Sequence, residues 1–139
     1  MSISTAELIR DALSLANIYG PTEAIEPEDV QFCLRKLNAL LADWETDNIN
    51  LQYFPQTMDE LGDDCPIPDD SILAVTYYLS FSIAPHYGKQ LLPQMLALGK
   101  SYYDRLLRDA VSAKLPAVKE PLVPRGTGDS AVSANILNG

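Results

Sequence analysis

The stretch that decides the fold is residues 71–115, which read SILAVTYYLSFSIAPHYGKQLLPQMLALGKSYYDRLLRDAVSAKL. In its first part, apolar side chains recur at steps of three and four residues, which places them on one side of a helix that must be buried. This first stripe consists of Ile72, Val75, Thr76, Leu79 and Ile83. A second stripe consists of Met95, Leu98, Tyr102, Leu106 and Val111. The stretch therefore predicts two apolar helices joined by a hinge.

The hinge is predicted at residues 83–88. Pro85 lacks the amide that would bond one turn back, and Gly88 tolerates the left-handed conformation that often ends a helix. Pro93 then suits the first turn of the next helix. The only histidine of the chain, His86, lies beside Tyr87 within the hinge. Since a metal or catalytic cluster needs several converging groups, we interpret His86 as a hinge residue.

The second helix of this pair has an apolar face broader than one neighbour could cover. Among the side chains that widen it are Leu96, Tyr103 and Leu107, which we take as candidates for contacts between protomers. A second contact surface is therefore expected on this helix, and assembly rather than catalysis is the kind of function that it favours.

Two more helices are predicted before this stretch. Ser4 and Glu7 have the spacing of a capping box, so a first helix should run from about residue 5 to residue 18, ahead of Gly20 and Pro21. Its inner face would be Leu8, Ile9, Ala12, Leu13 and Ala16. A second helix should begin at Pro27 and continue to about residue 47. Its apolar stripe is Val30, Cys33, Leu34, Leu37, Leu40, Leu41 and Trp44, with Trp44 interpreted as a core anchor.

The helical period disappears between residues 49 and 68. Ile49, Leu51 and Tyr53 alternate with polar residues, as in a short strand, and Pro55 limits any strand to an edge or a hairpin arm. The acidic residues of this stretch lack the fixed ligand spacing of a calcium-binding loop, so no metal site is predicted. We expect an irregular loop or a short hairpin here.

The net charge of −9 is unevenly distributed. Residues 1–72 carry fifteen Asp and Glu against three Lys and Arg, whereas residues 73–139 carry four against seven. The acidic half disfavours tight phosphate binding, so DNA binding through a basic patch is not expected. We interpret the acidity either as a solvated surface or as a surface that faces DNA without binding it.

The predicted fold is all-α: a four-helix bundle over residues 1–115, followed by an extended C-terminal arm over residues 116–139. The arm is rich in Pro and Gly and cannot form a core alone, but its apolar residues suit an arm that orders on a partner. At 139 residues the chain can fold without a disulfide, and Cys33 and Cys65 are not expected to pair. With no run of about 18 apolar residues and no leader pattern, we expect no membrane span and synthesis in a cytoplasm.

The hinge, the helix start near Pro93 and the tail together resemble one family. The tail residues concerned are Leu122, Val123, Pro124, Arg125, Gly126, Thr127, Gly128 and Asp129. The chain is similar to the head-to-tail adaptor of tailed bacteriophages, also called the packaged-DNA stabilisation protein or tail accessory factor of P22-like short-tailed phages. The resemblance covers nearly the whole chain.

The resemblance implies a virion protein at the head-tail interface that helps retain packaged DNA and provides the channel for its ejection. It implies an all-helical protomer in a ring, expected to be a dodecamer, under the portal protein. The tail nozzle or other tail proteins would attach below, and the arm would pack on the portal. No cofactor, metal or catalytic residue is implied. If the acidic half lines the channel, its candidates are Asp59, Glu60, Asp63 and Asp64, which would repel phosphate.

Two other functions are alternatives to this one. The first is a small helical module that binds another protein through the arm. The second is a peptidoglycan hydrolase using a carboxylate pair such as Glu45 and Asp59, which would need a sugar-binding cleft around both groups. Nothing in the sequence builds that cleft, so the chain is not expected to be an enzyme.

Overall fold

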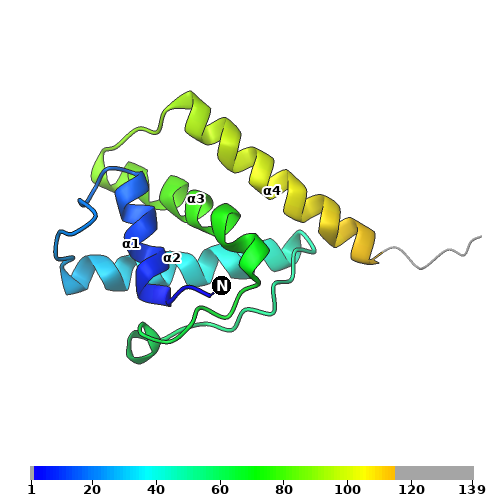
Figure 1. Cartoon of the computed structure of the whole chain (residues 1–139), viewed down its shortest axis with the longest axis horizontal. Helices are drawn as coiled ribbons and strands as arrows, with labels where there is room; N and C mark the ends of the chain where they lie inside the picture. The colour runs from blue at the N-terminus through cyan, green and yellow to red at the C-terminus, as the bar shows by residue number, and fades with distance from the viewer. Residues whose placement is uncertain (1, 115–139) are drawn as a thin grey trace, which may run out of the picture.

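The computed structural model describes residues 2–114, and the α-helices of this range confirm the predicted all-α class. The α-helices are α1 (Thr5–Leu15), α2 (Pro27–Thr46), α3 (Ile72–Ile83) and α4 (Pro93–Lys114). Short 3-10 turns lie at Met58–Glu60, Asp69–Ser71 and Ala84–Tyr87. Helix α3 contacts all three other helices, while α1 and α4 lie on opposite sides of it (Figure 1).

Helix α1 begins with the predicted capping box. The amide of Glu7 donates to Ser4 Oγ at 3.1 Å, and the amide of Ser4 donates to Glu7 Oε1 at 3.0 Å. The prediction that the helix continues to residue 18 was wrong, because Asn17 adopts a left-handed φ of 60° and ends it. The amide of Ile18 then donates a hydrogen bond to the Leu13 carbonyl at 2.9 Å. All members of the predicted inner face are buried.

The core lies between α1, α2 and α3. Its largest fully buried side chains include Leu8, Leu13, Leu37, Leu79 and Ile83. Burying each such side chain contributes about 1.5–3 kcal/mol, so these contacts between helices dominate the stability of the domain. Trp44 is 3% exposed, which confirms its interpretation as a core anchor, and Cys33 and Cys65 are buried free thiols.

The segment between α2 and α3 forms no strand in the described part of the chain, so of the two predicted alternatives it is the irregular loop and not the short hairpin. Gln52 has a φ of 61°, which interrupts the extended run that the alternation suggested. The loop instead lies against the start of the chain: the amide of Cys65 donates to the Ile3 carbonyl at 2.8 Å, and Ser4 and Asp64 form an isolated antiparallel bridge.

The predicted buried stripe of α4 was wrong at two positions. Leu98 is 42% exposed and Val111 is 53% exposed, whereas Leu106 is buried. The reason is that α4 packs mainly on α3, so neighbours cover only a narrow strip of its surface. The helix lies along the outside of α3 and its last turns project beyond it (Figure 1).

Candidate functional site

A close contact between α3 and α4 sets the position of α4. At Gly99 an added Cβ would lie 2.5 Å from Phe81 Cζ and 3.3 Å from Tyr77 Cβ, so no side chain fits between the helices at this point. The absence of a side chain lets the two backbones approach closely. Next to this close contact, the Tyr77 ring of α3 and the Tyr102 ring of α4 meet edge to face with centroids 5.3 Å apart.

An aromatic cluster ties the middle of α4 to the end of α2. The Tyr103 ring lies 5.3 Å from the Trp44 ring and 5.2 Å from the Tyr78 ring, centroid to centroid. Its hydroxyl donates to Asp47 Oδ2 at 3.1 Å. Burial, and next this hydrogen bond, raise the pKa of Tyr103. Of the predicted interface candidates, Tyr103 therefore makes extensive contacts within its own chain.

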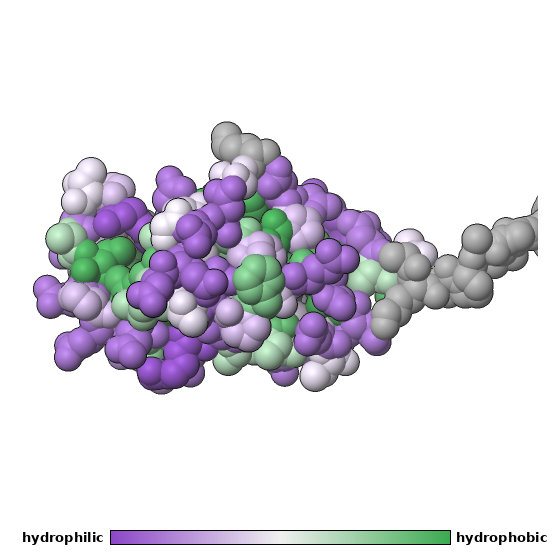
Figure 2. Space-filling view, turned by 90° about the horizontal axis from the view of Figure 1, so that it is seen from below, coloured by the Kyte–Doolittle hydropathy of each residue, from purple (hydrophilic) through white to green (hydrophobic). Residues whose placement is uncertain are grey.

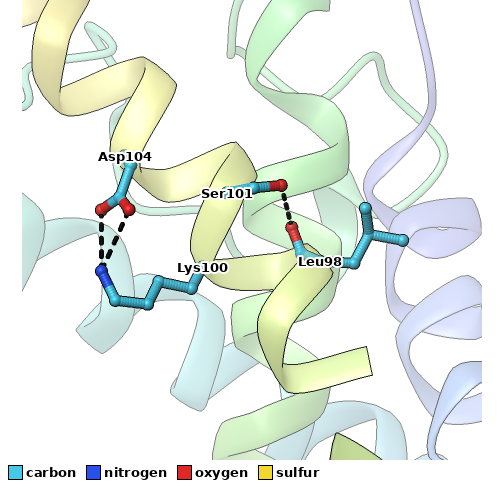
Figure 3. Close-up of polar contacts among 4 residues, drawn as sticks. All are labelled: Leu98, Lys100, Ser101 and Asp104. Carbon is cyan, nitrogen blue, oxygen red and sulfur yellow. Dashed lines mark hydrogen bonds and ion pairs between the residues drawn. The ribbon is translucent and has the colours of Figure 1, made fainter. Parts of the chain in front are cut away.

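The other two candidates border an uncovered side of α4. Leu96 is 45% exposed and Leu107 is half-buried. Between them, Lys100 Nζ and Asp104 Oδ2 form an exposed ion pair at 3.0 Å (Figure 3). Both residues of this pair belong to α4, so the pair does not tie this side of the helix to the rest of the protomer.

The opposite side of α4 is also partly apolar. Leu98 points away from Lys100 and Asp104, and its carbonyl accepts a hydrogen bond from Ser101 Oγ at 2.7 Å (Figure 3). The Arg105 guanidinium lies 5.6 Å from the centroid of the Tyr102 ring. Helix α4 thus exposes apolar groups on two sides. Elsewhere, the face seen in Figure 2 is mostly hydrophilic, with separate hydrophobic patches.

The hinge residues form the 3-10 turn that follows α3. Gly88 ends the turn with a φ of 68°, and its amide donates to the Pro85 carbonyl at 3.2 Å. His86 is exposed and meets the Phe32 ring edge to face at 4.8 Å between centroids. Tyr87 is half-buried and donates to Asp29 Oδ1 at 2.7 Å. Helix α3 thus ends in a turn that closes with a left-handed glycine, and the turn is docked on α2.

The acidic loop holds the four predicted channel-lining candidates. Asp59, Asp63 and Asp64 are exposed, whereas Glu60 is half-buried. The Glu60 carboxylate accepts the amide of Thr57 at 2.9 Å, which makes it a cap of the 3-10 turn. Three charges of the set are therefore free to act on a partner, and the fourth supports the loop.

Asn38 organises the segment before this loop, a role that the sequence did not reveal. Its Oδ1 accepts the amide of Gln56 at 3.0 Å and the hydroxyl of Tyr53, while its Nδ2 donates to the Gln56 carbonyl at 3.1 Å. Asn38 is not among the residues of the predicted apolar stripe of α2. The only signal was its position directly after Leu37, at the border of the buried face.

Two kinds of site considered from the sequence, a metal site and a carboxylate pair, can be checked against residues 2–114. No group of three or more His, Cys, Asp or Glu side chains in this range could hold a metal ion. Glu45 lines a small hollow of about 70 Å³, and Asp59 does not contribute to its lining. Within the same range, no helix is both long enough and apolar enough to cross a membrane.

The predicted portal-binding arm, residues 122–129, lies outside the described residues. Its members are Leu122, Val123, Pro124, Arg125, Gly126, Thr127, Gly128 and Asp129. A family model described as P22 tail accessory factor matches residues 3–137, which includes both the helical domain and this arm. A search of the curated proteins found no match.

Proposed function

The chain belongs to the P22 tail accessory factor family, and from this membership we propose that it forms the ring adaptor between the portal and the tail of a phage virion. A structural role in a phage tail follows from the family. The finer proposal is that identical copies form a ring, expected to be a dodecamer, that helps retain packaged DNA and provides the channel for its ejection. The tail nozzle or other tail proteins would bind below the ring.

The observation that carries this proposal is the uncovered apolar surface of α4. Leu96 and Val111 are 45% and 53% exposed on a helix that has one main neighbour in its own protomer. Exposed apolar groups on a projecting helix favour contacts with other protein surfaces. An exposed apolar side on such a helix suits contact with an identical neighbour in a closed ring.

The charge distribution supports a channel that does not bind DNA. Asp59, Asp63 and Asp64 are exposed on one loop, and if this loop faces the channel it repels the phosphate backbone. The arm at residues 122–129 is proposed to pack on the portal, so that docking on the portal and ring formation are coupled.

The test is the mass of the species formed when the full chain is mixed with portal protein from the same virus, measured by native mass spectrometry. A ring of copies on the portal is expected, and a chain truncated after residue 115 should lose binding. The full-length variant Leu122→Asp/Val123→Asp keeps the length of the arm and serves as the matched comparison. A chain that stays monomeric or dimeric beside the portal would contradict the proposal and would favour a small protein-binding module.

A further inference from the structure

We propose that the outer side of α4 on one copy docks into the groove between α1 and α3 of the next copy, with Arg108 meeting Asp11. This inference rests on the proposed ring, because it names the two surfaces that would join neighbouring copies. The occupant of the groove is therefore a second copy of this chain.

The groove is an apolar surface in which one large side chain is exposed and one buried hydroxyl has no hydrogen-bond partner among residues 2–114. It has a volume of about 460 Å³, and its walls include Leu15 from α1 and Leu73 and Tyr77 from α3. Leu73 is 49% exposed and lies between half-buried Ile72 and buried Ala74. The hydroxyl of Ser14, also in the wall, is buried without a hydrogen-bond partner among residues 2–114. A covering helix would bury Leu73 and exclude water from this surface.

The groove also carries a carboxylate that lacks a strong cationic partner in its own protomer. Burial, and next the charge of Glu7, raise the pKa of Asp11, against a smaller opposing effect of Arg10. The Arg10 guanidinium is held by the carbonyls of Pro21 and Glu23, to which its Nη1 donates at 3.2 and 2.8 Å. A cation from another copy would complement this carboxylate.

The outer side of α4 supplies the matching chemistry. Leu107, Arg108 and Val111 border one hollow on this side. Val111 is 53% exposed, and exposed Arg108 forms no ion pair with another residue in the described part of the chain. An exposed valine beside a free arginine is complementary to an exposed leucine beside an aspartate.

Within one protomer, the outer side of α4 points away from the residues on which α4 packs. Tyr102 of α4 contacts the groove residue Tyr77, so this side of α4 faces the groove of its own chain. Val111 follows Tyr102 by about two and a half helical turns and therefore points the opposite way. A contact between two different surfaces repeats from copy to copy and closes into a ring when the rotation allows it.

A charge exchange tests the contact. Asp11→Arg and Arg108→Glu should each reduce ring formation on portal protein by about tenfold or more, because each places like charges together. The double variant Asp11→Arg/Arg108→Glu should restore it. Arg35→Glu reverses an exposed cation of α2 that belongs to neither surface, and it should leave ring formation unchanged.

Disulfide trapping provides an independent readout. A Leu73→Cys chain and a Val111→Cys chain, mixed with portal protein under oxidising conditions, should form a covalent dimer that neither chain forms alone. Leu98→Cys replaces Val111→Cys as the control, since Leu98 is similarly exposed but points away from the outer side of α4 (Figure 3).

The outcomes separate this inference from the proposed function. Rings that form normally with either single reversal, a double variant that is not restored, or no Leu73 to Val111 cross-link would overturn the inference and leave the ring adaptor standing. A wild-type chain that forms no ring with the portal would overturn both.

Discussion

The hydroxyl of Tyr87 in the hinge donates a hydrogen bond to Oδ1 of Asp29 in the first turn of α2, across 2.7 Å. The Tyr19 hydroxyl donates to Oδ2 of the same carboxylate. One side chain therefore ties the segment after α1 and the turn after α3 to the start of α2. The direction in which the chain leaves α3 toward α4 depends on this junction.

Removal of the Tyr87 hydroxyl should weaken this junction. Tyr87→Phe keeps the ring and deletes one hydrogen bond to a charged acceptor, so the free energy of unfolding should fall by about 1.5–3 kcal/mol in urea titrations. Tyr102→Phe is the control, because the Tyr102 hydroxyl has no hydrogen bond within the described residues and its loss should change stability little. Equal effects of the two variants would contradict the role of the junction.

Stability should decrease in alkaline solution. Burial raises the pKa of the Cys33 thiol to about 12, and burial followed by the bond to Asp29 raises the pKa of Tyr87. In the unfolded chain these groups release their protons near their ordinary pKa values of about 8.5 and 10. The folded state therefore holds more protons above about pH 8.5, so its stability is complete below that pH and falls as the pH rises.

Urea midpoints measured between about pH 8 and 11 test this expectation. The midpoint should decline across the range, and Tyr87→Phe should decline less steeply above about pH 10 because one titrating group is gone. A midpoint that does not depend on pH would show that these groups are solvated in the folded protein.

The contact at Gly99 predicts that α4 cannot accept even a methyl group there. Gly99→Ala would place a Cβ 2.5 Å from Phe81 Cζ, and the Phe81 ring is confined by the Tyr78 ring at 5.0 Å. Overpacking of about 1–3 kcal/mol should exceed the gain of about 1 kcal/mol in helix propensity. Circular dichroism on thermal unfolding should show a lower midpoint.

Two further variants keep the Gly99 prediction specific. Gly99→Ala/Phe81→Leu should recover part of the loss, because the smaller side chain makes room for the new methyl group. Gly62→Ala is the control, since an added Cβ at Gly62 meets no atom within 4 Å. Equal midpoints for Gly99→Ala and the wild type would mean that α4 shifts along α3 at little cost.

The sequence predicted the helices well because their signals are local. Pro85 and Gly88 mark the hinge through backbone chemistry that needs no tertiary information. The buried face of α4 could not be predicted in the same way, since Leu98 and Tyr103 are similarly apolar and only the close contact at Gly99 decides which of them faces inward. The contacts of Asn38 depend on where the loop after α2 packs against that helix. The periodicity of apolar residues in the sequence carries no information about that position.

The candidate site was predicted only in part for the same reason. Leu96 was recognised from the excess width of an apolar face, and it is exposed. The groove beside Leu73 was missed, because the helix that contains Leu73 carries no charged residue to mark an exposed side. Whether such a residue is covered depends on the length and direction of α1, and not on the pattern around Leu73.

The acidic loop yields the last prediction, which concerns ejection. Asp59→Lys/Asp63→Lys/Asp64→Lys should slow DNA release from assembled virions, because cations in the channel would hold the phosphate backbone through contacts that weaken with added salt. Glu60 is left unchanged since its carboxylate caps the turn at Thr57.

Release of DNA after triggering is measured by dye fluorescence, and Asp43→Lys/Glu45→Lys on α2 reverses exposed acids elsewhere as the control. The loop variant should eject more slowly at low salt and approach the wild-type rate as salt is raised, because screening shortens the range of these contacts to about 8 Å at physiological ionic strength. Since both variants increase the positive charge of the protein, a delay confined to the loop variant places those aspartates beside the moving DNA. Equal rates for all the proteins at low salt would place the loop away from the channel.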